Sequence, residues 1–278
     1  LFSIGFKGGL ELAHSGFNKE VWITIGIAVL FFFAVPVYSY FLFRRKLDVY
    51  NAGALAATYG SVSAVTFVTA CSFLADKNMN FGGHMVACMA LMEAPAIVIG
   101  MVLIRTFSRN NQKDPNRHHF GHIIREAFSN GSVLMILGSL IIGLVADEKQ
   151  AEGIKPFTSD IFKGFLAVFL LDMGITATKR IRTFQQGGLV LALMGLLLPV
   201  VNAMLAIMIS HNLGVNDGDA FLLAILSSSA SYIAVPAALR LAVPQADPGY
   251  YIPMALAITF PFNIVVGIPL YYGLLQVL

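Results

Sequence analysis

The stretch Ser227-Ser-Ser-Ala-Ser-Tyr-Ile-Ala-Val-Pro236 places four serines inside a run that is otherwise apolar enough to cross a bilayer. Serines just before a proline loosen a helix, because proline lacks a backbone donor and clashes with the preceding turn. The freed backbone groups and the hydroxyls can then serve a bound solute. The stretch therefore predicts a broken membrane helix with a binding site at the break.

The composition is that of an integral membrane protein. Hydrophobic residues make up 57% of the 278 residues and charged residues 12%, whereas charged residues are about a quarter of a soluble domain. The net charge is +3 and the basic residues lie in short clusters, which argues against a nucleic-acid partner. The sequence contains no catalytic triad, phosphate-binding glycine loop or zinc motif, so we expect neither an enzyme nor an organic cofactor.

The histidines of His118-His-Phe-Gly-His122 have the i, i+4 spacing of a metal site. They lack the companion cysteines or carboxylates that complete a transition-metal site. We expect a solvated linker there, and Na⁺ as the only metal ion that the protein binds.

Nine apolar runs are candidates for membrane helices, which need about 20 residues to cross. The first is short enough to be the tail of a span, and the fifth needs residues from its flanks to cross. The runs cover residues 1–12, 21–43, 52–74, 84–106, 131–146, 160–177, 188–210, 219–241 and 250–277.

Landmarks of the first half recur in the second half at a nearly constant offset. Ser63-Ala64 recurs as Ser229-Ala230, at an offset of 166. A recurring offset of this size is the mark of a duplicated membrane domain. The stretch that contains Ser63 is therefore the predicted partner of the serine stretch before Pro236.

The second half holds five candidate spans, whereas the first holds three and a fragment, so we expect one helix and part of another to precede Leu1. Two repeats of five spans must run through the membrane in opposite directions. The predicted fold is an all-α membrane protein of ten helices in two inverted repeats. We expect the repeats at 1–106 and 131–278, joined by a linker at 107–130.

The charges of the loops predict the orientation. Lysine and arginine in short loops favour the cytoplasm. The cluster Arg44-Arg-Lys46, the segment 105–125 and the cluster Lys179-Arg-Ile-Arg182 fall on one side if every run crosses. We therefore expect the linker in the cytoplasm and both termini outside.

The two serine stretches are expected to meet near the middle of the membrane. Opposed half-helix N-termini there would present free N–H groups and positive dipole ends to an anion. The alternative is close helix packing through small residues. The expected substrate-binding residues are Ser61, Ser63, Ala64, Thr66, Ser228, Ser229, Ala230 and Ser231.

Two carboxylates lie inside apolar runs, Glu93 in Met92-Glu-Ala-Pro95 and Asp172 in Leu171-Asp-Met-Gly174. Such groups are costly in hydrocarbon and usually face a cavity or a partner. The alternative is an internal hydrogen-bonded pair near a helix end. We expect a cation to be bound by Glu93, Asp172, Tyr232, Thr259 and Asn263.

Several motifs occur together in a specific order: Ile4-Gly-Phe-Lys-Gly-Gly9, Tyr59-Gly-Ser-Val-Ser-Ala64, Met92-Glu-Ala-Pro95, Asp172-Met-Gly174, Ser229-Ala-Ser-Tyr-Ile-Ala-Val-Pro-Ala-Ala-Leu-Arg240 and Thr259-Phe-Pro261. With this order the chain resembles the sodium-dependent bicarbonate transporters of the cyanobacterial SbtA type. The resemblance covers essentially the whole chain. The cyanobacterial proteins carry an acidic residue where this chain has Tyr232, so we expect a member outside that branch.

The resemblance implies a core domain that moves against a gate domain, and a homotrimer in the plasma (inner) membrane. It implies Na⁺ as the coupling ion, bicarbonate as the substrate and a small cytoplasmic PII-like regulator. We therefore expect Na⁺-coupled uptake of bicarbonate, or of a similar small anion, by elevator-like alternating access. Two alternatives remain open, a sensor subunit that signals through residues 107–130 and a Na⁺/H⁺ exchanger that uses Glu93 and Asp172.

Overall fold

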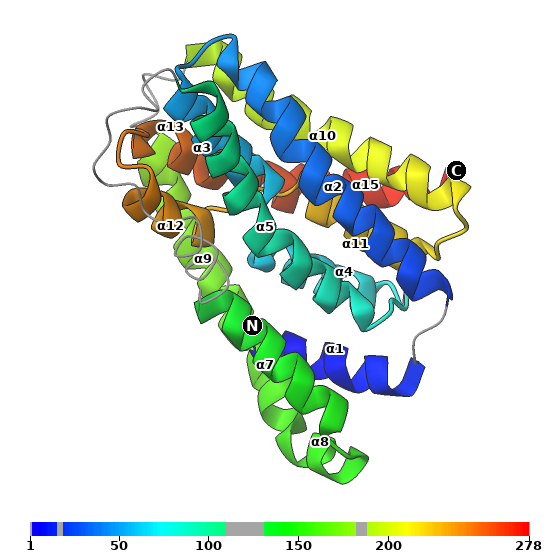
Figure 1. The fold of residues 1–278 in the computed structure, drawn as a ribbon. Helices are drawn as coiled ribbons and strands as arrows, with labels where there is room; N and C mark the ends of the chain where they lie inside the picture. Colours follow the sequence, from blue (N-terminus) through cyan, green and yellow to red (C-terminus); the bar gives the residue numbers. More distant parts are fainter. Residues whose placement is uncertain (1, 16–18, 109–130, 182–187, 278) are drawn as a thin grey trace.

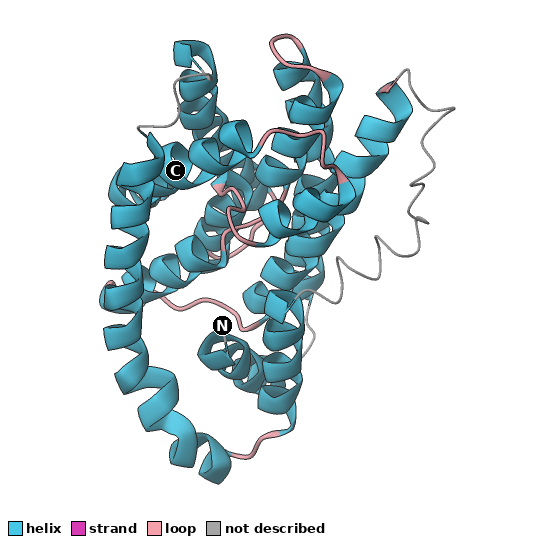
Figure 2. Cartoon of the chain, turned by 90° about the vertical axis from the view of Figure 1, so that its left-hand side faces the viewer, coloured by secondary structure: helices cyan, strands magenta, loops and turns pink. Residues whose placement is uncertain are grey.

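The computed structural model describes residues 2–15, 19–108, 131–181 and 188–277. All regular elements within these ranges are helical, and no strand occurs among them (Figure 2). This confirms the all-α prediction. The expected linker lies outside the described residues from residue 109 onward, and so do His118, His119 and His122.

Residues 2–15 and 19–108 form five helices. The predicted runs 21–43 and 84–106 match two of them to within two residues at each end, because both runs are uninterrupted apolar segments. The predicted run 52–74 is divided between two shorter helices. The elements are α1 (Phe2–Ser15), α2 (Lys19–Arg44), α3 (Val49–Gly60), α4 (Ala64–Asp76) and α5 (His84–Phe107).

In the second half, a short helix at 148–155 lies outside every predicted run, and one predicted run is again divided. The predicted run 219–241 forms two helices separated by five residues, and the last run includes two π-helical segments. The elements are α7 (Gly131–Val145), α8 (Glu148–Lys155), η1 (Pro156–Ile161), α9 (Phe162–Ile181), α10 (Gly188–Asn212), α11 (Asp217–Ser228), α12 (Ala234–Ala242), α13 (Pro248–Pro253), η2 (Met254–Thr259), α14 (Phe260–Phe262), η3 (Asn263–Gly267) and α15 (Ile268–Leu275).

Five helical segments of the described residues are long and apolar enough to cross a membrane. They are Lys19–Arg44, Val49–Asp76, His84–Phe107, Gly188–Asn212 and Pro248–Leu275. Figure 1 shows α2 and α10 along one edge of the molecule, with α1, α7 and α8 at the opposite end. The helix α7 has 15 residues, which is too few to span by itself.

The two divided runs cross each other at their breaks. The first break, residues 61–63, turns the chain into an extended conformation at Ser61 before α4 begins. The backbone N–H of Ser63 donates a hydrogen bond of 3.0 Å to Ser229 Oγ in the second break, 166 residues further along. In return, the N–H of Ser231 donates to the carbonyl oxygen of Thr58 at 2.9 Å. Each break therefore provides hydrogen-bond partners for backbone N–H groups of the other repeat's break.

A second close crossing joins α1 to α7. A Cβ atom added to Gly9 would lie 2.0 Å from the Leu140 carbonyl oxygen, and one added to Gly143 would lie 2.1 Å from the Phe6 carbonyl oxygen. Small residues let helix backbones approach this closely in a membrane. These glycines hold α1 and α7 together as one unit, apart from the crossed breaks.

Candidate functional site

Ser63 caps α4, and Ser231, two residues before the N-cap Ile233 of α12, accepts a hydrogen bond from that helix's first turn. Ser63 Oγ accepts hydrogen bonds from the backbone N–H of Thr66 at 3.2 Å and from Thr66 Oγ1 at 2.9 Å. Ser231 Oγ accepts from the backbone N–H of Val235 at 3.3 Å. An oxygen engaged as an acceptor leaves its own proton to donate elsewhere. Both hydroxyls therefore remain hydrogen-bond donors at the breaks.

The breaks open onto a cavity of about 770 Å³. One wall of the cavity comes from the breaks, α4, α5 and α12, and carries the polar residues Ser63, Glu93, Ser231 and Tyr232 among apolar ones. The other wall is mostly apolar and comes from α1, η1 and α9. Six predicted site residues line the cavity, namely Ser63, Ala64, Glu93, Asp172, Ser231 and Tyr232. The structure thus brings residues of both halves of the chain to one site.

Glu93 supplies a buried carboxylate to this cavity. Its side chain is 4% exposed, and Oε2 has no hydrogen-bond partner among the described residues. Its backbone carbonyl accepts a bond of 3.0 Å from the Ser61 hydroxyl, which links α5 to the first break. Burying a carboxylate oxygen without a partner costs folding free energy unless a ligand binds to it.

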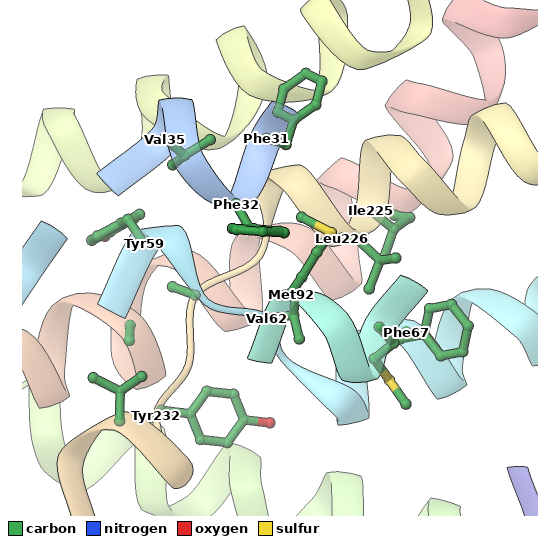
Figure 3. Packing of buried hydrophobic residues seen from close by; sticks show 14 of the residues in the cluster. Phe31, Phe32, Val35, Tyr59, Val62, Phe67, Met92, Ile225, Leu226 and Tyr232 are labelled. Atoms are coloured by element: carbon green, nitrogen blue, oxygen red, sulfur yellow. The ribbon is translucent and has the colours of Figure 1, made fainter. Parts of the chain in front are cut away.

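Tyr232 contributes a second buried polar atom without a partner. Its side chain is 8% exposed, and its hydroxyl has no hydrogen-bond partner within the described part of the chain. The ring packs on Phe260 with a centroid distance of 5.1 Å. Figure 3 shows it projecting from the second break, near Val62 of the first. The hydroxyl group is thus positioned to meet a solute in the cavity.

Thr259 and Asn263 do not line the cavity. The Thr259 hydroxyl donates to the Gly195 carbonyl at 2.8 Å and lies 2.8 Å from the Tyr59 hydroxyl. Asn263 donates to the Ser228 carbonyl at 2.8 Å and accepts from the Tyr271 hydroxyl at 3.2 Å. The Ser228 carbonyl lies at the end of α11, where carbonyls need such partners, so Asn263 supports the second break, whereas Thr259 links α10 to α3.

The other predicted substrate residues are buried beside the cavity and do not line it. Ser228 and Ser229 donate to carbonyls one turn earlier in α11, those of Ile225 and Leu226. The remaining residues of this group are Ser61, Thr66 and Ala230. The sequence pattern locates the breaks and does not separate the hydroxyls that face the solute from those that close the helix ends.

Asn202 is a supporting residue that the sequence analysis missed. Its side-chain nitrogen donates to the Ser227 carbonyl at 2.9 Å, and its side-chain oxygen accepts from the Tyr38 hydroxyl. The Ser227 hydroxyl donates to the Asn202 carbonyl at 3.3 Å. A lone amide within the apolar run 188–210 was the available signal.

A buried pair of His84 and Asp219 was also not predicted from the sequence. His84 Nε2 lies 3.1 Å from Asp219 Oδ2, and the two side chains are almost fully buried at the starts of α5 and α11. Asp219 also accepts from the Gly82 backbone N–H at 2.7 Å. The pair holds the two helix starts together outside the cavity.

A comparison with known protein families identifies the superfamily of the chain. The model of the Na⁺-dependent bicarbonate transporter superfamily matches residues 1–276. The chain belongs to this superfamily. The match confirms the resemblance seen in the motifs, and a transporter family implies that the protein is not an enzyme. No individual curated protein matches the chain.

The superfamily is Na⁺-dependent and transports bicarbonate. The hydroxyl-bearing residues Ser63, Ser231 and Tyr232 that line the cavity can donate to an anion, and the carboxylates of Glu93 and Asp172 can bind a cation. No group of three or more metal-ligating His, Cys, Asp or Glu side chains occurs in the described residues.

Proposed function

We propose that the protein couples Na⁺ entry to the uptake of bicarbonate, or a similar small anion, across the plasma (inner) membrane. The observation that carries this proposal is the joint lining of one cavity by Ser63 and Ser231, which come from opposite halves of the chain. Each lies just before a helix and presents a hydroxyl proton, and both features favour an anion.

The cation site of the proposal centres on Glu93. Its unpartnered Oε2 and the Tyr232 hydroxyl oxygen are buried in the same cavity, and oxygen atoms of these kinds suit Na⁺. Asp172 faces the cavity from α9. Asn263 acts by holding the second break and Thr259 by joining α10 to α3, because their polar atoms are engaged by protein groups.

The cavity lies between two groups of helices, and this supports an elevator-like cycle. We assign α2 to α5 and α10 to α15 to the core domain, because they carry the crossed breaks. We assign α1 and α7 to α9 to the gate domain, whose mostly apolar wall the core would slide past. A solute held at the breaks would then be exposed to each side of the membrane in turn.

The inverted repeats at 1–106 and 131–278 remain part of the proposal. Their support is the hydrogen bond between Ser63 and Ser229, which stand at the repeat offset. The proposal keeps the cytoplasmic linker at 107–130, both termini outside, the homotrimer and the PII-like regulator, which rest on the loop charges and the resemblance.

Uptake of radiolabelled bicarbonate by proteoliposomes tests the function. We expect uptake with an inward Na⁺ gradient and none when K⁺ replaces Na⁺. The variant Glu93→Gln should lose Na⁺ activation, whereas Glu152→Gln, which removes an exposed carboxylate of α8, should transport normally. Equal uptake with and without Na⁺ would refute the coupling.

Because two carboxylates line the same cavity, a Na⁺/H⁺ exchanger is a second candidate function. Glu93 and Asp172 would then carry protons in exchange for Na⁺. A pH-sensitive dye inside the proteoliposomes separates the two functions. Proton movement driven by Na⁺ without any anion, and abolished in Glu93→Gln, would support exchange over symport. A sensor subunit would instead bind bicarbonate without net flux.

A further inference from the structure

The cavity is large for the ions that the proposed symport would carry. Its volume of about 770 Å³ lies within the range of about 300 to 1,000 Å³ that is typical of pockets for drug-sized organic molecules. Such pockets are mostly apolar, with a few polar groups that orient the ligand. Bicarbonate and Na⁺ fill only a small part of this space, so the rest of the wall is available to the carbon skeleton of a larger ligand.

Phenylalanine rings form much of the apolar wall. Phe157 of η1 and Phe165 and Phe169 of α9 line the cavity and are exposed. Phe2 of α1 also lines it, and its ring centroid lies 6.3 Å from that of Phe157. The face of an aromatic ring attracts organic cations as well as apolar groups, because the ring quadrupole is negative there. The wall therefore favours a ligand with an apolar body and a positive charge.

The charges of the cavity favour the same class of ligand. The described lining residues include the carboxylates of Glu93 and Asp172 and no lysine, arginine or histidine. Oε2 of Glu93 is buried without a hydrogen-bond partner among the described residues, on a side chain that is 4% exposed. A protonated amine has the opposite charge and donates strong hydrogen bonds to a carboxylate. Glu93 is therefore the group that orients such a ligand.

We propose that the cavity is a binding site for amphipathic ammonium ions, whose N–H groups bind to Glu93 and whose apolar body packs on the phenylalanine wall. The ammonium group takes the place of Na⁺ at Glu93, so the two cations compete. Glu93 belongs to the assigned core domain and the phenylalanines belong to the gate domain. A ligand that bridges them blocks uptake. This consequence rests on the proposed symport, whereas the binding itself does not.

Calorimetric titration of the purified protein with phenethylammonium, in buffer without Na⁺, tests the binding directly. We expect binding that added Na⁺ weakens competitively. Phenethyl alcohol has the same ring without a charge, and hydrocinnamate carries a carboxylate in place of the amine. Both should bind about 10-fold more weakly or less, because neither donates a charged hydrogen bond to Glu93. Tighter binding of hydrocinnamate would assign the cavity to organic anions and overturn the proposal.

Two substitutions separate the charged part of the site from its apolar part. Glu93→Gln removes a hydrogen bond between charged groups, so the affinity for phenethylammonium should fall about 10-fold to 150-fold. Val168→Trp adds bulk to the apolar wall from an exposed position of α9. It should weaken phenethylammonium binding about 5-fold or more and leave Na⁺ binding at Glu93 intact. Glu152→Gln, in α8 and not among the lining residues, is the control and should bind like the wild type.

Equal affinity of Glu93→Gln and the wild type, or binding that Na⁺ does not weaken, would overturn the proposal. Binding that leaves Na⁺-driven uptake unchanged would also overturn it, because a ligand at Glu93 must inhibit. Na⁺-driven bicarbonate uptake in a protein that does not bind phenethylammonium would refute this inference and uphold the symport. Binding that depends on Glu93, in a protein without uptake, would uphold the site and refute the symport.

Discussion

Replacing Ser231 by alanine should weaken anion binding far more than it weakens the fold. The change removes the oxygen that accepts from the Val235 N–H at 3.3 Å, and loss of one such hydrogen bond costs about 1 kcal/mol. For a protein of this length that lowers the melting temperature by about 2 to 4 °C. The change also removes one hydroxyl donor from the cavity.

A hydrogen bond to a charged group contributes about 1.5 to 3 kcal/mol, so the KM for bicarbonate should rise roughly 10-fold to 150-fold at saturating Na⁺. Uptake by proteoliposomes over a range of bicarbonate concentrations measures this, and thermal unfolding in detergent measures the stability. Ser210→Ala is the matched control, because Ser210 Oγ is buried in α10 without a partner. That variant should transport normally and be no less stable. An unchanged KM in Ser231→Ala, or an equal loss in Ser210→Ala, would refute the reasoning.

Three further substitutions test separate parts of the structure. Tyr232→Phe removes a hydroxyl without a protein partner, so it should leave the melting temperature unchanged and lower the affinity for bicarbonate about 5-fold or more in uptake assays. Asn263→Leu leaves the partners of two buried hydrogen bonds unsatisfied and should destabilise the fold by about 2 to 6 kcal/mol in thermal unfolding; an unchanged melting temperature would contradict this. Gly143→Ala forces a Cβ to within 2.1 Å of a backbone oxygen and should destabilise by about 1 to 3 kcal/mol, whereas Gly138→Ala, with open space around it, should not.

The family and the positions of the breaks were predictable from local sequence. Membrane helices are recognised by the length of an unbroken apolar run. That length alone predicts the helices at 21–43, 84–106 and 188–210. Serines clustered in such a run mark a break, because only a loosened helix makes use of them. The prediction that the two serine-rich runs divide is confirmed at residues 61–63 and 229–233.

The roles of individual hydroxyls were not predictable in the same way. Ser63 and Ser229 are equivalent in the repeat, yet the first lines the cavity and the second donates to the Leu226 carbonyl of the preceding helix. Thr259 and Asn263 follow the pattern of cation ligands, but carbonyls of α10 and α11 engage them. A buried polar group bonds to whichever partner packing brings near, and that partner is distant in sequence.

The sequence by itself determined that the chain is a helical membrane protein with two polar breaks, because apolar length, proline and serine act over a few residues. Only the tertiary structure decided that Glu93 and Asp172 face one cavity from opposite walls, and that Ser63 bonds to Ser229. Those relations depend on how helices far apart in the chain pack together. The stretch before Pro236 therefore predicts where the chain breaks, and the opposing helices decide what the break can bind.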